Sequence, residues 1–236
     1  MTRNLRINQL TSDLELLQAR VIFDHTWPMS AGSEITPNLL KAMVHTGSYL
    51  SGAFIDNKIV GAAFAFPATT DGLHLHSHMT AVLPEFRDKG VGYTLKIDQW
   101  NWAKKNNYSH LSWTFDPLVR RNARLNIAKL GVEISTYYPN FYGEMPDALN
   151  AGDESDRLMV SWRTDIDAPK ARELITKPET GVILIEIPED IVAIRSKNQS
   201  ESMKWRRQVR EQFLAAFEKN GKVIGFSANN EYVVRI

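Results

Sequence analysis

Three histidines on alternate residues lead into a basic, glycine-containing loop in HLHSHMTAVLPEFRDKGVG, residues 74–92. Alternate residues of an extended strand point to the same side, so the three histidines are expected to share one face with Val82. A histidine is near neutral at pH 7 and can accept a proton from a reacting group. The pattern therefore places three possible proton acceptors on one face of a strand that leads into the basic loop.

Two other interpretations of the histidines stay open. The HxHxH pattern can present imidazoles to a metal ion, but no carboxylate ligand is adjacent and the chain has no cysteine. Metal binding is therefore the less favoured of the two. Alternatively, the histidines are polar cleft or surface residues that transfer no proton, because apparent base candidates often prove to be structural.

The loop RDKGVG, residues 87–92, lies between a predicted strand and a predicted helix. Its two glycines allow the backbone to approach a ligand, and the N–H groups of a helix N-terminus favour a phosphate. Arg87 and Lys89 add positive charge. The loop lacks GK[ST] and GxGxxG, so it is neither a P-loop nor a dinucleotide fingerprint. The alternative is an ordinary strand-to-helix turn with solvated basic residues.

Helices and strands follow from capping residues, apolar spacing and turn residues. Ser12 begins a capping box, with Leu14, Leu17 and Val21 at helical spacing behind it. The expected helices span about 12–26, 37–46, 90–107, 122–130 and 199–220. The expected strands lie in 48–67 (two strands joined at Asp56-Asn57), 73–82, 110–115, 132–138, 156–162, 181–188 and 222–236 (a hairpin turning at Asn229-Asn230). This order predicts a mixed α/β sheet, with a core over 1–164 and a strand–helix–hairpin extension over 165–236 packed on it.

The run VLPEFRDKGVGYTLK resembles the acyl-CoA-binding motif of the GNAT acyltransferase superfamily, Gln/Arg-x-x-Gly-x-Gly/Ala after a strand. RRNARLNIAKLGVEI resembles the second motif of that superfamily. Further segments, such as YYPNFYG and SDRLMVSW, resemble a subgroup of predicted GNAT acyltransferases, some of which occur beside N-succinylamino-acid racemases. The resemblance covers about residues 5–164 and implies a mostly antiparallel central sheet with splayed strands 4 and 5.

The resemblance also implies a co-substrate and its binding residues. Acyl-CoA, either acetyl-CoA or succinyl-CoA, would bind without a metal. The pantetheine arm would lie against Val82, and the loop would surround the phosphates through Arg87, Asp88, Lys89, Gly90, Val91 and Gly92. Asn122 and Asn126 would bond pantetheine amides or cap a helix. Lys129 would meet a CoA phosphate, or lie at a helix C-terminus, where cations are favoured.

Some members of the superfamily place a glutamate base eleven residues before the first position of the loop motif, which here is His76. His78 lies one strand repeat nearer the thioester. The tyrosine that many members use to protonate the CoA thiolate is replaced by Ile127. Tyr138 is the candidate substitute among the tyrosines just downstream, or the thiolate leaves without a dedicated acid, since an ordinary thiol has a pKa of about 8.5.

The charge balance gives no general reason to expect nucleic acid or a membrane, since 28 Lys and Arg stand against 27 Asp and Glu. The absence of cysteine excludes thiolate catalysis and disulfides. The basic stretch of residues 204–210 is expected to be a solvated face, or to offer Arg206 or Arg210 to a substrate carboxylate. No signal-peptide core is present. The expectation is a cytoplasmic protein that binds neither nucleic acid nor a membrane, with a homodimer left open.

Three functions remain on the sequence alone. The first is an enzyme that transfers an acetyl or succinyl group from acyl-CoA to the amine of a small molecule, such as an amino acid. The second is a catalytically silent GNAT-like protein that binds CoA as a sensor or scaffold, which the absent tyrosine favours. The third is a partner-binding protein whose C-terminal extension forms a dimer interface.

Overall fold

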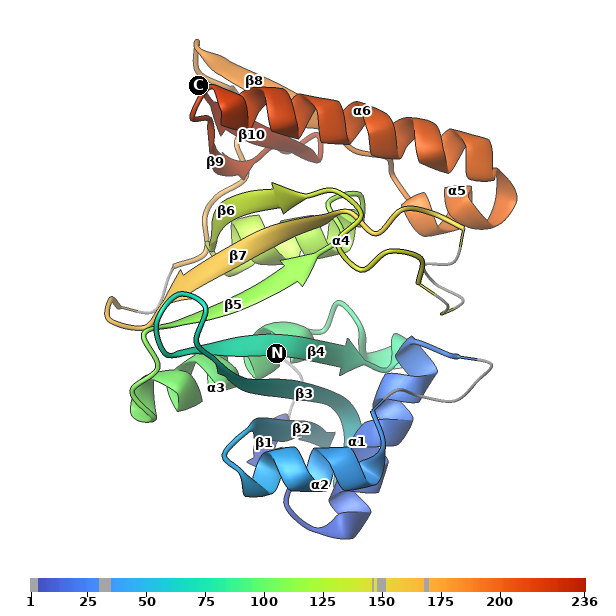
Figure 1. Cartoon of the computed structure of the whole chain (residues 1–236), viewed down its shortest axis with the longest axis vertical. Helices are drawn as coiled ribbons and strands as arrows, with labels where there is room; N and C mark the ends of the chain where they lie inside the picture. The colour runs from blue at the N-terminus through green and yellow to red at the C-terminus, as the bar shows by residue number, and fades with distance from the viewer. Residues whose placement is uncertain (1–3, 30–34, 146, 148–151, 168–169) are drawn as a thin grey trace. The chain divides into compact units, whose positions relative to one another are not determined.

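The computed structural model describes residues 4–29, 35–145, 147, 152–167 and 170–236 (Figure 1). In chain order its elements are β1 (Arg6–Gln9), α1 (Asp13–Thr26), α2 (Pro37–His45), β2 (Tyr49–Ile55), β3 (Lys58–Ala68), β4 (His74–Val82), the 3-10 turn η1 (Pro84–Phe86), α3 (Val91–Lys105), β5 (His110–Phe115), α4 (Arg120–Ala123), the π-helix η2 (Arg124–Lys129), β6 (Glu133–Tyr138), β7 (Arg157–Arg163), β8 (Val182–Glu186), α5 (Ile191–Lys197), α6 (Gln199–Glu218), β9 (Lys222–Phe226) and β10 (Glu231–Arg235).

The strands form two sheets. The larger has the order β1-β2-β3-β4-β5-β7-β6, and the smaller has the order β8-β10-β9. The pairs β1–β2, β2–β3, β3–β4 and β6–β7 are antiparallel, whereas β4 and β5 are parallel. The prediction of a mixed, mostly antiparallel α/β sheet is confirmed.

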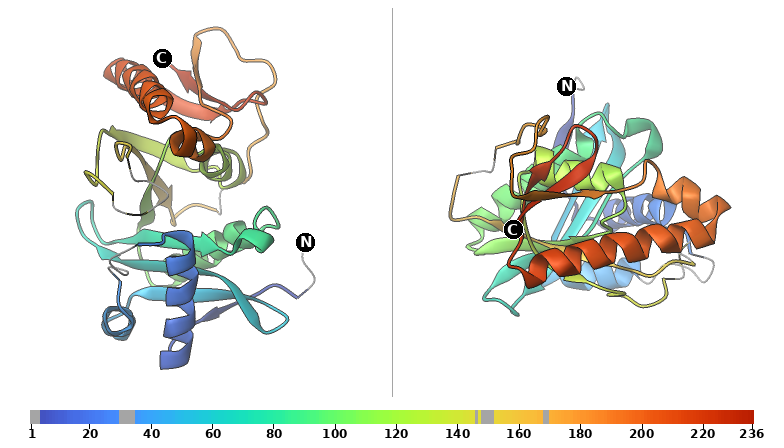
Figure 2. Two further views of the ribbon diagram at one scale, coloured as in Figure 1. Left: turned by 90° about the vertical axis from the view of Figure 1, so that its right-hand side faces the viewer. Right: turned by 90° about the horizontal axis from the view of Figure 1, so that it is seen from above.

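By its internal contacts the chain divides into two compact units. Unit 1 comprises Met1–Trp113 and Arg163–Asp167, and unit 2 comprises Thr114–Trp162 and Ala168–Ile236. The division expected from the sequence, at residue 164, stays a proposal. The strand, helix and hairpin expected in the C-terminal extension are present as β8, α6 and β9–β10, and α6 runs along the smaller sheet (Figure 2).

In unit 1, helices cover both faces of the strands (Figure 2). On one face α1 and α2 enclose a core that includes Phe23, Leu40 and Phe64. On the other face α3 packs so closely that a Cβ built on Gly61 of β3 would lie 3.3 Å from atoms of Val91 and Leu95. Side chains of alternate strand residues therefore pack against different helices, α1 and α2 on one face and α3 on the other.

The predicted capping box of α1 is present: Ser12 Oγ accepts from the N–H of Glu15, and the Glu15 carboxylate accepts from the N–H of Ser12. The apolar spacing, however, marked the wrong side of the helix. Leu14, Leu17 and Val21 are 66%, 49% and 59% exposed, and the buried residues are Leu16, Ala19, Ile22 and Phe23. Apolar residues occur on both sides of α1, so spacing alone selects no face.

Local turn chemistry explains several boundaries. Asp56 and Asn57 both have positive φ, 48° and 66°, as the predicted tight hairpin between β2 and β3 requires. The predicted helix over 122–130 instead begins at Arg120 and widens into the π-helix η2 before Gly131, whose φ is +64°. The elements β1 and α5 were not predicted from the sequence, because four and seven residues are too few to show a periodic apolar pattern.

Candidate active site

A β-bulge divides β4 at His78. Before the bulge His76 pairs with Phe66 and Ser77 with Ala65, but the next pair along β3 is Phe64 with Met79, so His78 is an extra residue. After the bulge Val82 pairs with Gly61. Phe66 and Gly61 are five residues apart on β3, so their partners lie on opposite faces of the sheet.

The expectation that all three histidines share a face with Val82 is therefore wrong. Val82 faces α3, since its Cγ2 atom lies 3.8 Å from a Cβ built on Gly92. His76 faces the other layer, where its ring centroid lies 5.3 Å from that of Phe66. The physical reason is the single extra residue of the bulge, which shifts the alternation of side chains by one.

The pairing of β4 with β5 is short. Its ladder contains two residue pairs, Leu75 with Leu111 and His76 with Ser112. The next residues, Ser77 and Trp113, are not paired with each other in this ladder. We call this point, where the two strands part, the fork. It agrees with the splayed strands that the family resemblance implied.

His76 lies at the fork in a largely buried setting. Its Nδ1 atom is 2.9 Å from Ser112 Oγ, and either atom can be the donor. Burial, with smaller contributions from His78, His74 and Lys96, lowers the pKa of His76 to about 4. His76 is therefore neutral at pH 7 and free to accept a proton, although it is a weak base. His78 is exposed, and its ring centroid is 5.7 Å from that of Phe66 and 6.4 Å from that of His76.

His74, the third histidine, is buried and stacks on His110 of β5. The two ring centroids are 4.4 Å apart, and the planes differ by 8°. The Nδ1 atom of His74 is 3.0 Å from the carbonyl oxygen of Gly72, and that of His110 is 3.0 Å from Ser109 Oγ. Among the residues that the structure describes, no group of three or more His, Asp or Glu side chains is arranged to hold a metal ion.

The predicted phosphate loop leads directly into α3. Gly90 is the N-cap residue and has a left-handed φ of +85°, which suits glycine, and Asp88 also has a positive φ of 59°. No side chain caps this end of α3, and its first turn carries no acidic residue. Of the first-turn residues, Val91 is buried and Gly92 is partly exposed. The first backbone N–H groups of α3 thus form an uncapped positive end.

The two basic residues of the loop differ in their partners. Arg87 Nε donates to the carbonyl oxygen of Val82 at 3.1 Å, which joins the end of β4 to the loop. Lys89 extends over the ring of Phe86, with its Nζ atom 5.5 Å from the ring centroid. The loop and Val82 thus form one local structure within unit 1.

Unit 2 holds the other predicted site residues. Asn122 lies in α4, where its N–H donates to the carbonyl oxygen of Val119. Asn126 is buried in η2 and Lys129 ends that helix on the exposed side. Ile127 is completely buried. Tyr138, at the end of β6, is 36% exposed, and its ring centroid lies 5.2 Å from that of Phe141.

Arg206 is not available to a substrate carboxylate, contrary to one interpretation of the sequence. Its guanidinium donates to both carboxylate oxygens of Asp116, at 2.7 and 2.9 Å, and to Asp153, and its side chain is only 2% exposed. Arg210 is paired with Glu154 and Asp156. Burial would raise the pKa of Asp116, but Arg206 and neighbouring arginines lower it well below its usual range. These arginines stabilise the fold of unit 2.

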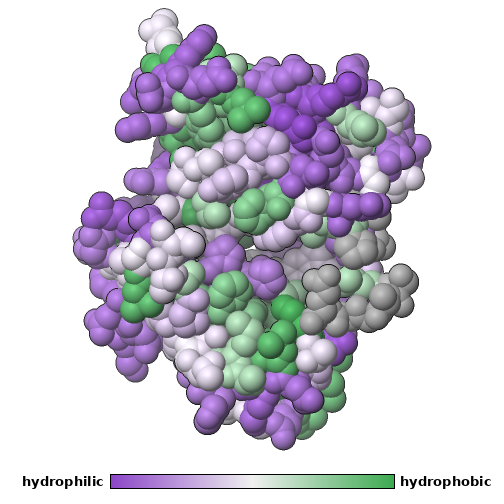
Figure 3. Space-filling model, in the orientation of Figure 1, coloured by the Kyte–Doolittle hydropathy of each residue, from purple (hydrophilic) through white to green (hydrophobic). Residues whose placement is uncertain are grey.

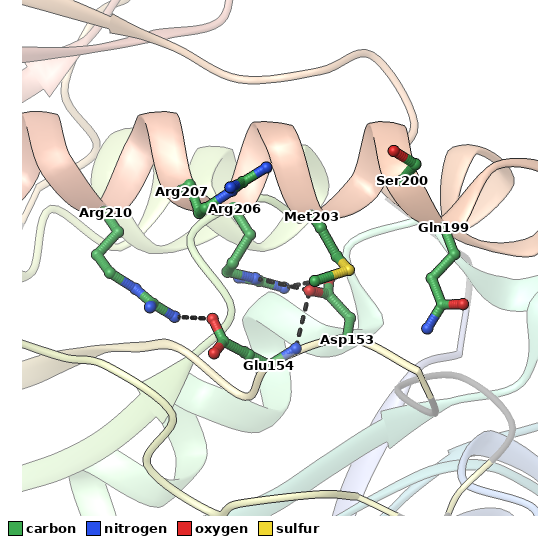
Figure 4. A pocket seen from close by; sticks show the side chains of 8 residues that line it. All are labelled: Asp153, Glu154, Gln199, Ser200, Met203, Arg206, Arg207 and Arg210. Atoms are coloured by element: carbon green, nitrogen blue, oxygen red, sulfur yellow. Dashed lines mark hydrogen bonds and ion pairs between the residues drawn. The ribbon is translucent and has the colours of Figure 1, made fainter.

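The outer side of this cluster borders a surface cavity of about 440 Å³. It is lined by Asp153, Glu154, Gln199, Ser200, Met203, Arg206, Arg207 and Arg210 (Figure 4). Hydrophilic residues gather over α6 (Figure 3), as the sequence predicted for a solvated, mixed-charge helix face.

Two residues at the fork escaped the sequence analysis. Ser112 is recognisable only once the register of β4 with β5 places it opposite His76. Lys96 looks like one basic residue among several on α3, yet it is almost fully buried. No helix among the described residues is long and apolar enough to cross a membrane.

Comparisons with known proteins agree with this geometry. Residues 16–131 match the family model described as Acetyltransferase (GNAT) family. The chain thus contains an acetyltransferase domain of the GNAT family. No curated protein sequence matches.

Solved structures with a similar fold have low sequence identity. A putative GNAT acetyltransferase from Desulfovibrio desulfuricans has a TM-score of 0.52 at 15% identity, over 68% of this chain and 99% of that one. Arabidopsis thaliana Naa50, in complex with the bisubstrate analogue CoA-Ac-MVNAL, has a TM-score of 0.53 at 16% identity, over 66% of this chain and 97% of that one. The Escherichia coli ribosomal-protein-S18-alanine N-acetyltransferase has a TM-score of 0.53 at 14% identity, over 68% of this chain and 94% of that one. These similarities establish the fold.

Proposed function

We propose that the protein transfers an acyl group from acyl-CoA to a primary amine, by direct attack of the amine on the thioester while both substrates are bound. The observation that carries the proposal is the uncapped N-terminus of α3, which follows β4 directly through a loop with Gly90 in the left-handed region. Backbone N–H groups there suit the pyrophosphate of CoA. The GNAT domain supplies the reaction class.

CoA would bind with its pantetheine arm against Val82 and its phosphates at residues 87–92. Beyond the fork, β4 has backbone groups that β5 does not occupy, and these can pair with the pantetheine amides. Backbone N–H groups near the bulge can polarise the thioester carbonyl, because they remain fixed while negative charge develops on its oxygen. The proposal that Asn122, Asn126 and Lys129 also contact the cofactor rests on the resemblance of RRNARLNIAKLGVEI to the second family motif.

His76 is the proposed base, oriented by Ser112, with His78 as the alternative. Its low pKa keeps it neutral, so the proton that it accepts must come from an amine already made acidic by attack on the thioester. Tyr138 is the proposed proton donor to the CoA thiolate, since its hydroxyl is on an exposed residue and Ile127 cannot serve. Departure of the thiolate without an acid is the simpler alternative.

Acetyl is the proposed acyl group, with succinyl as the alternative, and a small amine or amino acid is the proposed acceptor. Two structural neighbours are a ribosomal-protein-S18-alanine N-acetyltransferase and Naa50 in complex with the bisubstrate analogue CoA-Ac-MVNAL, so a peptide N-terminus is a further acceptor to test.

The second candidate is a catalytically silent CoA-binding protein, favoured by Ile127 at the position where many members have a tyrosine. A thiol-release assay separates the two. It would pair acetyl-CoA and succinyl-CoA with a panel of amines, D- and L-amino acids and short peptides. Turnover with any pair supports the enzyme, whereas CoA binding by calorimetry without turnover supports the silent protein.

A further inference from the structure

Lys96 is a buried lysine without a carboxylate partner. It lies on α3, is 5% exposed, and forms no ion pair with any acid among the described residues. Its Nζ atom instead lies 2.6 Å from Ser77 Oγ, 3.5 Å from Gln99 Oε1 and 3.9 Å from the centroid of the Trp113 ring. A hydroxyl, an amide and an aromatic face thus surround the ammonium group.

Two of these three partners define the fork. The last pair of the β4–β5 ladder is His76 with Ser112. Ser77 is the next residue on β4 and Trp113 is the next on β5. Lys96 therefore contacts, with one atom, the first residue of each strand beyond the point where their pairing ends.

The same contact adjoins the bulge. Ser77 is the last residue of β4 paired in register before the extra residue His78. A hydrogen bond to its side chain fixes the strand immediately before the alternation shifts. Fork and bulge are thus both held from the α3 side, while the ring of His76 lies on the opposite face with Phe66.

This arrangement is unfavourable for stability. Burial lowers the pKa of Lys96 to about 7, which means that the fold resists the charge that an exposed lysine would carry. An apolar side chain of similar length would avoid that penalty. The contacts of Lys96 therefore call for an explanation other than stability.

We propose that Lys96 is a positioning residue that holds Ser77 of β4 and Trp113 of β5 apart at the fork, and so fixes the bulged strand end beside which the thioester lies. The role of this strand end in catalysis rests on the proposed function. The local effect of Lys96 on β4 does not, and can be measured in the protein without substrate.

The decisive variant is Lys96→Met, which keeps the length of the side chain and removes its charge and donors. We expect a melting temperature at pH 7 that is at least as high as that of the wild type, with kcat about tenfold lower, because a small displacement of the reacting groups is enough for such a loss. The KM for acyl-CoA should change less than about threefold, since the loop at residues 87–92 is untouched. Backbone amides of residues 77–79 should exchange hydrogen about tenfold faster than in the wild type.

Two further variants complete the test. Ser77→Ala removes the partner of Lys96 on β4 and should reproduce the lower kcat and the faster local exchange; it decides the matter should Lys96→Met fold poorly. Lys104→Met is the matched control, because Lys104 also lies on α3 with its Nζ 4.9 Å from a tryptophan ring centroid, that of Trp100, but is exposed. Lys104→Met should change neither kcat nor the hydrogen exchange of residues 77–79.

Unchanged exchange at residues 77–79 in both Lys96→Met and Ser77→Ala would overturn the inference, whatever the activity. Faster exchange with unchanged kcat would restrict Lys96 to a structural role and would also overturn it. If the wild-type protein turns over no acyl-CoA, the proposed function fails. The exchange measurement then still decides whether Lys96 holds the fork.

Discussion

His76 and Val82 lie on opposite faces of β4, although they are six positions apart, an even spacing that would place them on the same face of a regular strand. The bulge at His78 causes this, because its extra residue shifts the alternation of side chains between the first half of β4, which contains His76, and the second half, which contains Val82. The residue proposed as proton acceptor and the residue proposed to contact pantetheine therefore lie on opposite faces of the strand. This arrangement suits the proposed reaction if acyl-CoA binds along one face of β4 and the amine approaches its thioester carbon from the other face.

If His76 is the base, the pH dependence of kcat has a distinctive form. The pKa of His76 is lowered to about 4, so the neutral, active form persists well below the usual range of histidine. We expect the acidic limb of kcat, measured with both substrates saturating, to fall near pH 4. His76→Gln should lower kcat by roughly 100-fold and remove that limb.

Ser112→Ala is the test of orientation, because Ser112 Oγ is the partner of His76 Nδ1. It should lower kcat by a smaller factor, about tenfold. His78→Gln provides the matched comparison on the neighbouring ring. A full loss of kcat with His78→Gln and no loss with His76→Gln would show that His78, the bulge residue, is the base.

The sequence predicted local structure better than it predicted which residues share a strand face. The capping box at Ser12, the turn at Asp56-Asn57 and the strand–loop–helix unit around Gly90 are all set by neighbouring residues, and all are present. The bulge at His78 depends on how β3 pairs with β4, which no local pattern records. A strict period of two therefore placed Val82 on the wrong face relative to His76.

Contacts between residues far apart in the sequence were the second feature that the sequence could not predict. The sequence predicted Arg206 to be one charge of a solvated helix face. In the structure it is buried, because it pairs with the carboxylate of Asp116, 90 residues away in the sequence. Lys96 likewise gave no signal, because its burial depends on Ser77 and Trp113 from two different strands. In both cases the tertiary contact, which sequence spacing cannot show, decides the role of the side chain.

Arg206→Met should strongly destabilise the protein. The buried carboxylates of Asp116 and Asp153 then keep their ion pairs with Arg195 but lose those with Arg206. Removing one partner of a buried ion pair costs about 3–5 kcal/mol in the free energy of unfolding. Urea unfolding would measure the loss. Arg207→Met, one residue along α6 on an exposed side chain, should change stability by less than about 0.5 kcal/mol. Similar losses for the two variants would contradict the assigned network.

Lys96→Met should change how stability depends on pH. The pKa of Lys96 is about 7 in the folded protein and 10.5 for the free side chain, so between these values the unfolded chain binds more protons than the folded one. Wild-type stability should therefore rise with pH across this interval. The advantage of the methionine variant should be largest below pH 7, on the order of 5 kcal/mol at most, and should vanish near pH 10.5. Chemical denaturation at a series of pH values would show this. A difference that stays constant with pH would mean that Lys96 does not titrate as a buried group.

Gly92→Asp tests the phosphate site without relying on damage to the fold. Gly92 lies in the first turn of α3, has no positive φ, and a Cβ placed on it would make only an ordinary contact with Val82 at 3.8 Å. A carboxylate in the first turn of a helix is favourable, so the melting temperature should hold or rise slightly. The same charge would repel the pyrophosphate of CoA, and calorimetry should show an affinity at least about tenfold lower, more than 1.4 kcal/mol of binding free energy.

Gly92→Ala separates charge from size, because it adds the same Cβ without the carboxylate. It should bind CoA with an affinity within about threefold of the wild type. Raising the salt concentration should narrow the gap between the aspartate and alanine variants, since screening weakens repulsion between exposed charges. Equal CoA affinity for Gly92→Asp and Gly92→Ala, with both variants folded, would place the phosphates away from the N-terminus of α3 and would remove the observation on which the proposed function rests.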